Sequence, residues 1–411
     1  MQRWVKFSKY LNQMGYGCHV ITVDEQYASY PSIDNSLQKD VTASIKVTKT
    51  KSFEALKIFS SLFKKEKVPY AGIPDKNKMS VVGKLALYIR SNFFIPDARI
   101  GWNKYALAEC KKIIEKENID VLITTSPPHS TQLIGLALKK QFPKVKWIAD
   151  MRDPWTDIYY YPKLSHTENA KQKDKTFEKN VLQQADMITT VSSDLKRMYL
   201  EKSDKINSDK IKILPNGFDE TDFENTHTTS NEVFTIAHIG TINSNYNING
   251  FLEAVKKLET KTQLKVKFIG NVDGFIKQQL TASISSVEFT PYVSHAEAIQ
   301  LMQNSDLLLL AIPDNKDNKG ILTGKLFEYL AAQKPILCLG PPNGDAAEII
   351  RDCGAGKTYC FDDSENIFLY LQNVYDTWTK NKSTTLVSKN YKKYSRKELA
   401  KKYSEIIESL F

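Results

Sequence analysis

Short apolar runs alternate with segments of helical periodicity along the whole chain. In the first half, residues 121–125 read as a buried strand, and residues 130–141 repeat apolar positions at helical spacing. In the second half, residues 234–239 form an apolar run that ends at Gly240. Strands that alternate with helices are typical of parallel sheets with crossover helices. The pattern therefore predicts an α/β fold.

The same alternation predicts the other elements. Further strands are expected at residues 18–23, 146–149, 187–191, 266–269, 287–289, 307–311 and 335–339. Further helices are expected at residues 4–14, 106–117, 177–184, 249–258, 296–304, 325–332 and 395–410. We expect two doubly wound, Rossmann-like sheets that face each other across a cleft, with ligands bound outside the carboxyl ends of the strands.

The length of the chain favours two domains. Its 411 residues exceed the size at which single hydrophobic cores stop growing, and 41% hydrophobic and 25% charged residues are ordinary for globular domains. The turn-forming residues 214–217 (Leu-Pro-Asn-Gly) separate the two arrays of elements. We predict one Rossmann-like domain over residues 1–205 and a second over residues 206–390. A C-terminal helix within residues 391–411 is expected to return to the first domain.

The cysteines show no paired spacing. They stand at positions 18, 110, 338, 353 and 360, without Cys-x-x-Cys pairs or nearby histidine clusters, so we expect reduced thiols in the core and no metal site. No apolar run reaches the roughly 18 residues that a transmembrane helix needs, and no signal peptide is recognisable at the N-terminus. These features indicate a soluble, cytoplasmic protein.

The net charge of +10 at pH 7 comes in large part from residues 39–84, a basic segment in which lysines interleave with apolar residues. Within it, Leu56, Phe59, Leu62 and Phe63 recur at helical spacing. Such a helix would suit an anionic bilayer, and the same pattern also describes an ordinary helix with its apolar face on the core. Both interpretations stay open here. Nucleic-acid binding is not expected, because no recognition motif accompanies the charge.

The segment with the clearest chemistry is residues 320–335 (GILTGKLFEYLAAQKP). It places Gly324 and Lys325 at the start of a helix, where free N–H groups and the positive dipole end suit a pyrophosphate. One turn later, Glu328 would point the same way and could accept the hydroxyl protons of a ribose. The alternative is an ordinary amphipathic helix that keeps Glu328 as a solvated surface residue.

A second polar cluster follows one of the expected strands. Asp150, Arg152 and Asp153 place two carboxylates and a guanidinium at the carboxyl end of this strand, where they could bind acceptor hydroxyls or stabilise charge at a reacting carbon. The structural alternative is an Arg–Asp pair that caps the next segment, with Trp155 in the core. His129, which opens an expected helix, either contacts substrate or only caps that helix.

Together these segments resemble the GT-B glycosyltransferases of the family-4 type, or group 1. The resemblance spans nearly the whole chain, because the matching segments occur in the family's order in both halves. In the first half they are residues 96–102 (PDARIGW), 125–129 (TSPPH) and 149–155 (ADMRDPW), which are similar to one bacterial subgroup. In the second half they are residues 216–219 (NGFD), 240–241 (GT), 291–295 (PYVSH), 320–335 and 340–344 (GPPNG), with Glu348 beyond.

The resemblance implies a retaining transferase that uses a nucleoside-diphosphate sugar and needs no metal or other cofactor. In the family, a helix of this kind carries a glutamate that holds the donor ribose, and Glu328 occupies that position. The implied donor-binding residues are Gly240, Thr241, Val293, Thr323, Gly324, Lys325, Leu326 and Glu328. The implied catalytic residues of the first domain are Asp150, Arg152 and Asp153, with His129 as a substrate contact.

The expected partners are a nucleotide sugar and a saccharide or lipid-linked acceptor used in the synthesis of cell-surface polysaccharide. The first domain would bind the acceptor and the second the donor. No protein nucleophile is assigned, so Lys325 and neighbouring N–H groups would stabilise the leaving diphosphate. The enzyme would act in the cytoplasm, and at the inner face of the membrane if the basic segment contacts lipid.

Three features depart from the family pattern. The glutamate that usually stands eight residues before Glu328 is replaced by Gly320, and the basic pair that usually follows Gly240 is replaced by residues 242–247 (INSNYN). The chain also opens directly into a helix, whereas the family begins with a central strand and a glycine-rich loop. We therefore expect an unfilled central position in the first sheet, and low stability or activity for the chain as written.

Two other functions stay open at this point. A non-hydrolysing sugar-nucleotide epimerase shares the fold, but it needs a set of catalytic carboxylates and a histidine that the sequence does not supply convincingly. A non-catalytic protein that binds a sugar nucleotide, or none, and serves as a partner of other enzymes agrees with Gly320 and with the absent first strand. Turnover of a donor that is lost in Glu328→Ala would favour the transferase.

Overall fold

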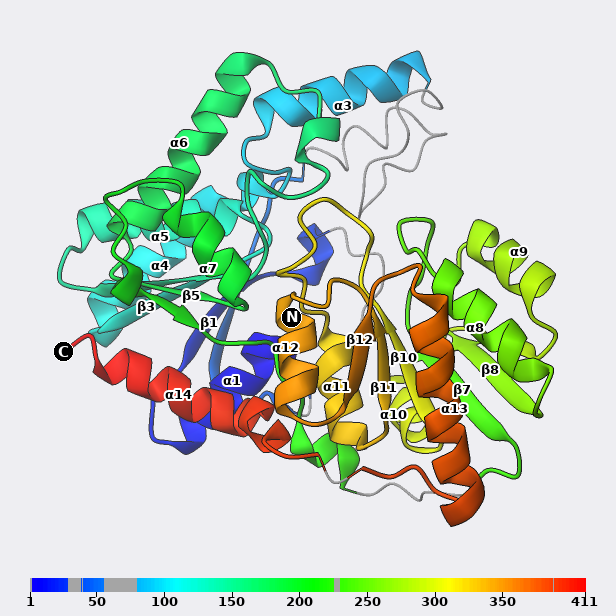
Figure 1. The fold of residues 1–411 in the computed structure, drawn as a ribbon. Coiled ribbons are helices and arrows are strands. Elements are labelled where there is room, and N and C mark those ends of the chain that lie inside the picture. Colours follow the sequence, from blue (N-terminus) through cyan, green and yellow to red (C-terminus); the bar gives the residue numbers. More distant parts are fainter. Residues whose placement is uncertain (1, 29–37, 39, 55–79, 225–229, 387) are drawn as a thin grey trace. The chain divides into compact units, whose positions relative to one another are not determined.

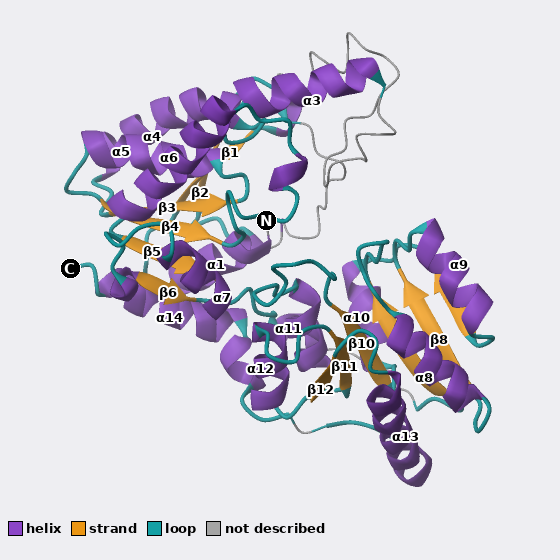
Figure 2. Cartoon of the chain, turned by 45° about the horizontal axis from the view of Figure 1, so that its top comes forward, coloured by secondary structure: helices purple, strands orange, loops and turns teal. Residues whose placement is uncertain are grey.

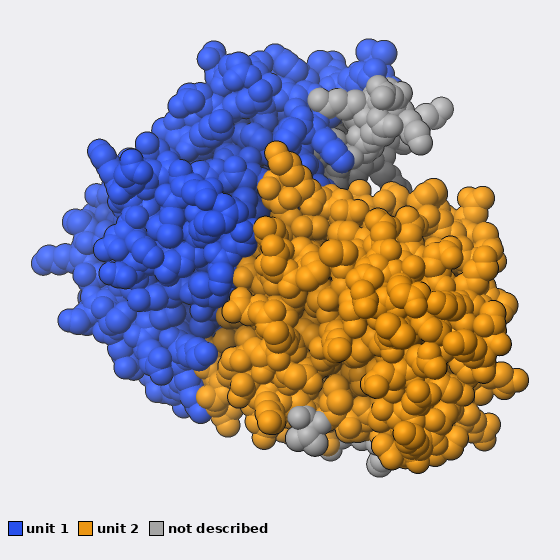
Figure 3. All heavy atoms as spheres, viewed as in Figure 1, with its two compact units in different colours: residues 1–214, 400–411 blue, residues 215–399 orange. Residues whose placement is uncertain are grey.

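The computed structural model describes residues 2–28, 38, 40–54, 80–224, 230–386 and 388–411. The chain divides into two compact units (Figure 3): unit 1 comprises residues 1–214 and 400–411, and unit 2 comprises residues 215–399. The amphipathic helix considered around residues 56–63 lies outside the described residues. Both units are built on parallel strands, which confirms the predicted α/β class.

Unit 2 contains one parallel sheet with the strand order β12-β11-β10-β7-β8-β9 (Figures 1 and 2). Its strands are β7 (Phe234–Ile239), β8 (Leu264–Ile269), β9 (Val287–Thr290), β10 (Leu307–Ala311), β11 (Ile336–Leu339) and β12 (Gly356–Tyr359). Its helices are α8 (Asn249–Glu259), α9 (Gly274–Ser283), α10 (His295–Gln303), α11 (Gly324–Ala332), α12 (Asp345–Asp352) and α13 (Ser364–Asn381).

Helices cover both faces of this sheet, so both faces are apolar. Leu307 and Leu309 of β10 pack with α8 and α13, whereas Leu308 and Leu310 pack with α10, α11 and α12. This burial on two faces explains why β10 is a continuous apolar run in the sequence. The helix after β7 and the helix after β10 lie on opposite faces, which places the topological switch point of the sheet between these two strands.

Unit 1 contains two separate parallel sheets. β1 (His19–Val23) pairs with β2 (Lys46–Thr50), and β3 (Val121–Ser126), β4 (Lys146–Met151), β5 (Met187–Thr190) and β6 (Ile211–Ile213) pair in that order. The helices are α1 (Gln2–Gln13), α3 (Val81–Phe93), α4 (Asn103–Glu117), α5 (Ser130–Gln141), α6 (Glu168–Gln184), α7 (Ser193–Leu200) and α14 (Arg396–Glu408), of which residues 400–408 belong to unit 1.

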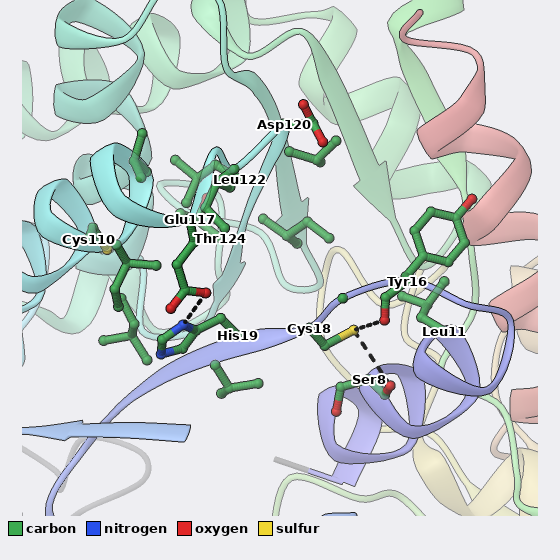
Figure 4. A pocket seen from close by; sticks show the side chains of 18 of the residues that line it. Ser8, Leu11, Tyr16, Cys18, His19, Cys110, Glu117, Asp120, Leu122 and Thr124 are labelled. Carbon is green, nitrogen blue, oxygen red and sulfur yellow. Dashed lines mark hydrogen bonds and ion pairs between the residues drawn. The ribbon is translucent and has the colours of Figure 1, made fainter. Parts of the chain in front are cut away.

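A cavity of about 810 Å³ lies between β1 and β3 in unit 1 (Figure 4). Cys18 and His19 line it from the first strand, and Leu122 and Thr124 line it from the second. Helices α1 and α14 contribute to its lining from one face of the strands, and α4 and α5 from the other. A doubly wound sheet of this class has the strand order 3-2-1-4-5-6. When β2 and β1 are counted as strands 3 and 2 of that general order, the cavity lies at the position of its strand 1.

The prediction was most accurate for long apolar runs. Most of the elements that it missed are short or exposed, but the 18-residue α13 is neither. It missed β2, β6, β12, α3, α7, α9, α12 and α13. It also began α6 at residue 177, whereas the helix begins at Glu168. The first turns of α6 are rich in lysine and glutamine, so they carry little apolar periodicity, and Thr167 rather than an apolar residue marks their start as an N-cap.

Candidate functional site

The switch point of unit 2 brings the carboxyl end of β7 next to the start of α11. β7 is followed by Gly240, whose φ of +120° is a conformation that favours glycine. A Cβ atom at Gly240 would lie 3.2–3.3 Å from the Cδ, Cε and Nζ atoms of Lys325. The Lys325 side chain, which belongs to the first turn of α11, therefore passes directly over the turn at Gly240.

Two acceptors hold the Lys325 ammonium at this turn. Its Nζ lies 3.2 Å from Nε2 of His238 and 3.3 Å from the carbonyl oxygen of Thr241. Burial lowers the pKa of Lys325 to about 8, while the charge of Glu328 acts in the opposite direction. At neutral pH most of the lysine is therefore still a cation.

The N-terminus of α11 has no side-chain cap. Thr323 occupies the cap position, but its side chain makes no capping hydrogen bond, and its buried Oγ1 has no partner among the described residues. In the same unit, Asp273, Ser294 and Asp363 cap α9, α10 and α13, whereas α8 and α12 also begin without a side-chain cap. The first N–H groups of α11 have no acceptor within the helix and carry its positive dipole end. Together with the nearby ammonium, they form a site suited to an anion.

Glu328 lies one turn further along α11 and is paired with His295 of α10. Its Oε1 is 3.1 Å from Nε2 of His295, and the two side chains are 20% and 33% exposed. The hydrogen bond that His295 donates to the Glu328 carboxylate is the main cause that raises the pKa of His295. A partner on a neighbouring helix thus orients the carboxylate, which is not a freely solvated surface group.

The other residues predicted to bind the donor surround this cluster. Gly324 is exposed, and nothing lies within 4 Å of the position that a Cβ atom would take there. Val293 is half-buried against the core on the α11 face of the sheet. Leu326 is fully buried in that core, and its N–H donates to the carbonyl oxygen of Thr323 at 3.2 Å. Leu326 therefore serves the site mainly by anchoring the helix.

Asp150 of unit 1 is completely buried, and both of its oxygens are engaged. Four side chains donate to them at 2.7–3.2 Å: Arg3, Trp4, Thr125 and Thr189. Burial opposes ionisation, but the charges of Arg3 and Arg152 and these hydrogen bonds keep the pKa of Asp150 below its ordinary value. The carboxylate therefore ties α1 to the carboxyl ends of β3, β4 and β5, and it presents no unbonded oxygen to a substrate.

Arg152 and Asp153 lie nearer the surface than Asp150. Arg152 donates from Nε to the carbonyl oxygen of Ser126 at 3.1 Å, and the same atom lies 3.9 Å from Asp150. The Asp153 carboxylate makes no hydrogen bond to any described residue, and burial raises its pKa. Of the two carboxylates predicted here, only Asp150 has both oxygens engaged in hydrogen bonds.

His129 stacks on Trp155, with ring centroids 5.0 Å apart and an interplanar angle of 13°. Burial lowers the pKa of His129 to about 3, so the ring is neutral at physiological pH. Its side chain does not cap α5, which was the alternative considered from the sequence. Instead, Asp97 accepts the N–H and the hydroxyl of Ser130 at 2.8 and 2.9 Å.

Sequence reasoning overlooked His238 and gave His295 no role of its own. His238 is the polar residue within the otherwise apolar end of β7. A histidine inside such an apolar run is the sequence signal that could have indicated it, because a buried imidazole needs hydrogen-bond partners. The partners of Asp150 had no comparable signal, because Arg3 is separated from it by 147 positions in the sequence.

No group of three or more His, Cys, Asp or Glu side chains among the described residues is arranged to hold a metal ion. All of the cysteines are free thiols, and Cys110, Cys338 and Cys353 are buried as expected. The predicted core position is wrong for Cys360, which is exposed, and Cys18 is only half-buried. Within the described part of the chain, every helix is too short or too polar to span a bilayer.

The sequence matches two family models. Residues 72–222 match the model described as Glycosyltransferase Family 4, and residues 219–393 match the model described as Glycosyl transferases group 1. The second match contains β7, α10 and α11 with all of the residues predicted to bind the donor. A comparison with curated proteins finds no match.

Several solved structures share the fold. Sucrose-phosphate synthase from Thermosynechococcus elongatus has a TM-score of 0.62 at 12% identity, over 99% of this chain and 92% of its own. A glycosyltransferase from Rickettsia africae has a TM-score of 0.59 at 14% identity, over 99% and 93%. HepE from Anabaena, in complex with UDP and glucose, has a TM-score of 0.57 at 12% identity, over 99% and 95%. These likenesses confirm the predicted fold class of two Rossmann-like domains, as in the GT-B fold.

Proposed function

Because the chain belongs to the family-4, group 1 glycosyltransferases, we propose that it moves a sugar from a nucleoside-diphosphate sugar, with retention at the anomeric carbon, to a saccharide or lipid-linked acceptor. Glycosyl transfer follows from membership of the family. Retention, the acceptor and a role in cell-surface polysaccharide synthesis are our proposal. The proposed position of the donor site rests on the uncapped start of α11, with Lys325 above the turn at Gly240 and Glu328 one turn later.

The diphosphate of the donor would bind at the start of α11. The N–H groups of Gly324 and Lys325 point out of the helix end, and the Lys325 ammonium adds a full positive charge beside them. When the bond between the anomeric carbon and the diphosphate oxygen breaks, the diphosphate leaves with the electron pair and becomes more negative. These groups then stabilise the leaving group more strongly than the bound donor, which is what accelerates the reaction.

The ribose of the donor would bind Glu328. Glu328 lies three positions after Lys325, which corresponds to about 4.5 Å along a helix axis, so a ribose next to the diphosphate is within reach of the carboxylate. His295 holds Oε1 of Glu328, and Oε2 has no hydrogen-bond partner among the described residues. The carboxylate is thus oriented by one oxygen and can accept a ribose hydroxyl with the other.

The acceptor side is assigned to Asp153 and Arg152 of unit 1, with His129 nearby. The acceptor oxygen forms the new bond to the anomeric carbon, and its proton passes to the leaving diphosphate. Asp153 would orient the acceptor hydroxyl, since its carboxylate has no partner among the described residues. Asp150 would act only by fixing the backbone that carries Arg152 and Asp153.

We also propose that donor binding needs no metal, because Lys325 and the start of α11 supply positive charge at the diphosphate. The affinity for UDP is then expected to be the same in EDTA and in Mg²⁺.

We propose that the protein acts at the cytoplasmic face of a membrane. This is supported by the apolar side chains that α3 exposes beside Lys84: Val81 at 83%, Leu85 at 55% and Phe93 at 73%.

UDP is the probe of choice for this proposal, because HepE, which shares the fold, has been solved with UDP and with UDP-glucose. Isothermal titration of UDP, together with UDP release from UDP-glucose in the presence of mixed saccharide acceptors, measures binding and turnover. Glu328→Ala and Lys325→Met are each expected to weaken binding about tenfold or more. Exposed residues of the same unit supply the matched controls Glu253→Ala and Lys316→Met.

The outcomes separate the proposal from its alternatives. Turnover that is lost in Glu328→Ala and kept in Glu253→Ala supports the transferase. A donor that binds without turnover on any acceptor indicates a non-catalytic nucleotide-sugar protein. If folded protein binds none of UDP, ADP and GDP, the donor site proposed here is wrong.

A further inference from the structure

We infer that His238 is a positioning residue for donor binding, because its Nε2 holds the Lys325 ammonium over the turn at Gly240. The inference rests on the proposed function, in which Lys325 binds the donor diphosphate. His238 itself is 1% exposed, so it acts through the lysine and does not touch the donor. No residue of this kind was predicted from the sequence.

The hydrogen bonds of His238 determine its tautomer. Nδ1 lies 3.0 Å from the carbonyl oxygen of Leu309 on β10, so Nδ1 carries the proton and donates it. In a neutral imidazole the other nitrogen is then an acceptor. Nε2 lies 3.2 Å from Nζ of Lys325, which only donates. Both ring nitrogens of this buried side chain are therefore satisfied.

The arrangement leaves the ammonium with one N–H for a ligand. A lysine ammonium has three donors, and here His238 and the carbonyl oxygen of Thr241 accept two of them. The aliphatic part of Lys325 is confined as well, because it passes over Gly240. A flexible side chain that is already ordered loses less conformational entropy when a diphosphate binds.

The charged groups around the pair are few. Lys325 faces His238 of β7 and Glu328 of its own helix, and His238 faces Lys325 together with the backbone of Leu309 and Thr241. Burial first, and then the charge of Lys325, keeps the pKa of His238 far below its ordinary value. The imidazole therefore stays neutral, and it remains an acceptor over the pH range in which the enzyme would work.

A purely structural role for His238 makes different predictions. Its ring packs near Phe268, with ring centroids 5.6 Å apart, so it also fills space in the core. If space filling were its whole contribution, phenylalanine would replace it with an effect on stability alone. A positioning role instead predicts a change in the affinity for UDP and in the way that this affinity depends on pH.

The experiment measures UDP affinity by isothermal titration for the full chain and its variants. His238→Phe is expected to weaken UDP binding about tenfold. His238→Gln should recover most of the loss, because its amide both accepts and donates. The control is Tyr329→Phe, which removes a buried hydrogen bond from the N–H of Ile239 on the same strand but leaves Lys325 untouched. It should lower the melting temperature without changing the affinity.

The pH dependence supplies a second readout. UDP affinity of the wild type should fall as the pH rises through about 8, where Lys325 loses its proton. In His238→Phe the fall should begin at lower pH, since the ammonium has lost an acceptor. In a Lys325→Met background, His238→Phe should cause no further loss, because the side chain through which it acts is gone.

Three results would overturn the inference while leaving the proposed function intact. The first is a wild type that binds UDP and is weakened by Lys325→Met but not by His238→Phe. The second is an equal loss from His238→Phe with and without Lys325. The third is a ¹⁵N shift of His238 Nε2 that is the same in the wild type and in Lys325→Met, a measurement that needs no substitution of the histidine. Absence of UDP binding by the folded wild type would overturn both proposals.

Discussion

Two histidines of unit 2 have opposite electrostatic surroundings. His295 faces the carboxylate of Glu328, which raises its pKa, whereas His238 is buried and faces the ammonium of Lys325, so its pKa is lowered. The first is therefore readily protonated and donates to the carboxylate, and the second stays neutral and accepts from the lysine. One residue type thus orients the anion and the cation of the proposed donor site.

The His295–Glu328 pair gives a stability prediction with a defined direction. The pKa of His295 in the folded chain lies above its ordinary value of 6.5, so protonation favours the folded state. The stabilisation is fully present below about pH 6.5 and disappears as the pH rises through the raised pKa. His295→Gln should therefore lower the melting temperature more at about pH 5.5 than at about pH 8.5. A loss that is equal at both values, or larger at the higher one, would contradict this.

Substitution of each of the two carboxylates of unit 1 should distinguish an effect on stability from an effect on catalysis. Asp150→Asn removes the charge that compensates buried Arg3, and breaking such a pair typically costs about 3–5 kcal/mol of unfolding free energy. Asp153→Asn, in contrast, breaks no hydrogen bond to a described residue, so stability should change little while sugar transfer falls. Urea unfolding and UDP release measure the two effects. Equal stability of both variants would show that Asp150 does not hold unit 1 together.

At the scale of elements, the cavity between β1 and β3 is where unit 1 departs from a continuous sheet. Each of these strands is the edge of its own parallel sheet, and edge strands carry unpaired backbone groups. The helices that line the cavity come from both faces, and most of the side chains they contribute are apolar, such as Leu11 and Ile134. A strand placed there would have the surroundings of a central strand, apolar on both faces.

This geometry predicts the effect of an engineered extension. Arg3 and Trp4 bind Asp150 at the carboxyl end of β4, so α1 starts at the edge where a parallel strand in the cavity would end. About five apolar, β-branched residues joined to Gln2 by a short glycine-rich turn should raise the melting temperature by about 5 °C or more. An extension of equal length in which every second residue is lysine serves as the control. The same change from both extensions would contradict insertion into the sheet.

At the scale of the whole molecule, our proposal of an anionic membrane as a partner rests on charge and exposed apolar surface. The chain carries a net charge of +10, and α3 exposes Val81, Leu85 and Phe93. A basic protein with such a helix gains both electrostatic attraction and apolar burial at a lipid surface.

We therefore expect the protein to sediment with vesicles that contain anionic lipid, and much less with zwitterionic vesicles. Replacement of Val81, Leu85 and Phe93 by serine should reduce the bound fraction several-fold, and added salt should reduce it further by screening. Tyr292→Ser is the control, because Tyr292 is 85% exposed and lies in unit 2. Equal binding of the triple variant and the control would exclude α3 as the contact.

The amino-acid sequence alone determined the α/β class, the main strands and the residues of α11. Strands such as β10 are buried on both faces and therefore appear as continuous apolar runs, which can be recognised from the local sequence pattern. Gly324, Lys325 and Glu328 share one short helix, so their relative placement follows from helical geometry. The similarity to the family over both halves of the chain indicated the activity.

Only the tertiary structure decided which polar groups are paired and which are available. His238 meets Lys325 across 87 positions of sequence, and Arg3 meets Asp150 across 147. Such partners are brought together by strand register and helix packing, and the burial that shifts their pKa values is a property of the folded chain. For this reason the sequence pattern assigned Asp150 and Asp153 the same role, whereas in the folded chain both oxygens of Asp150 are hydrogen-bonded and the Asp153 carboxylate has no hydrogen bond to a described residue.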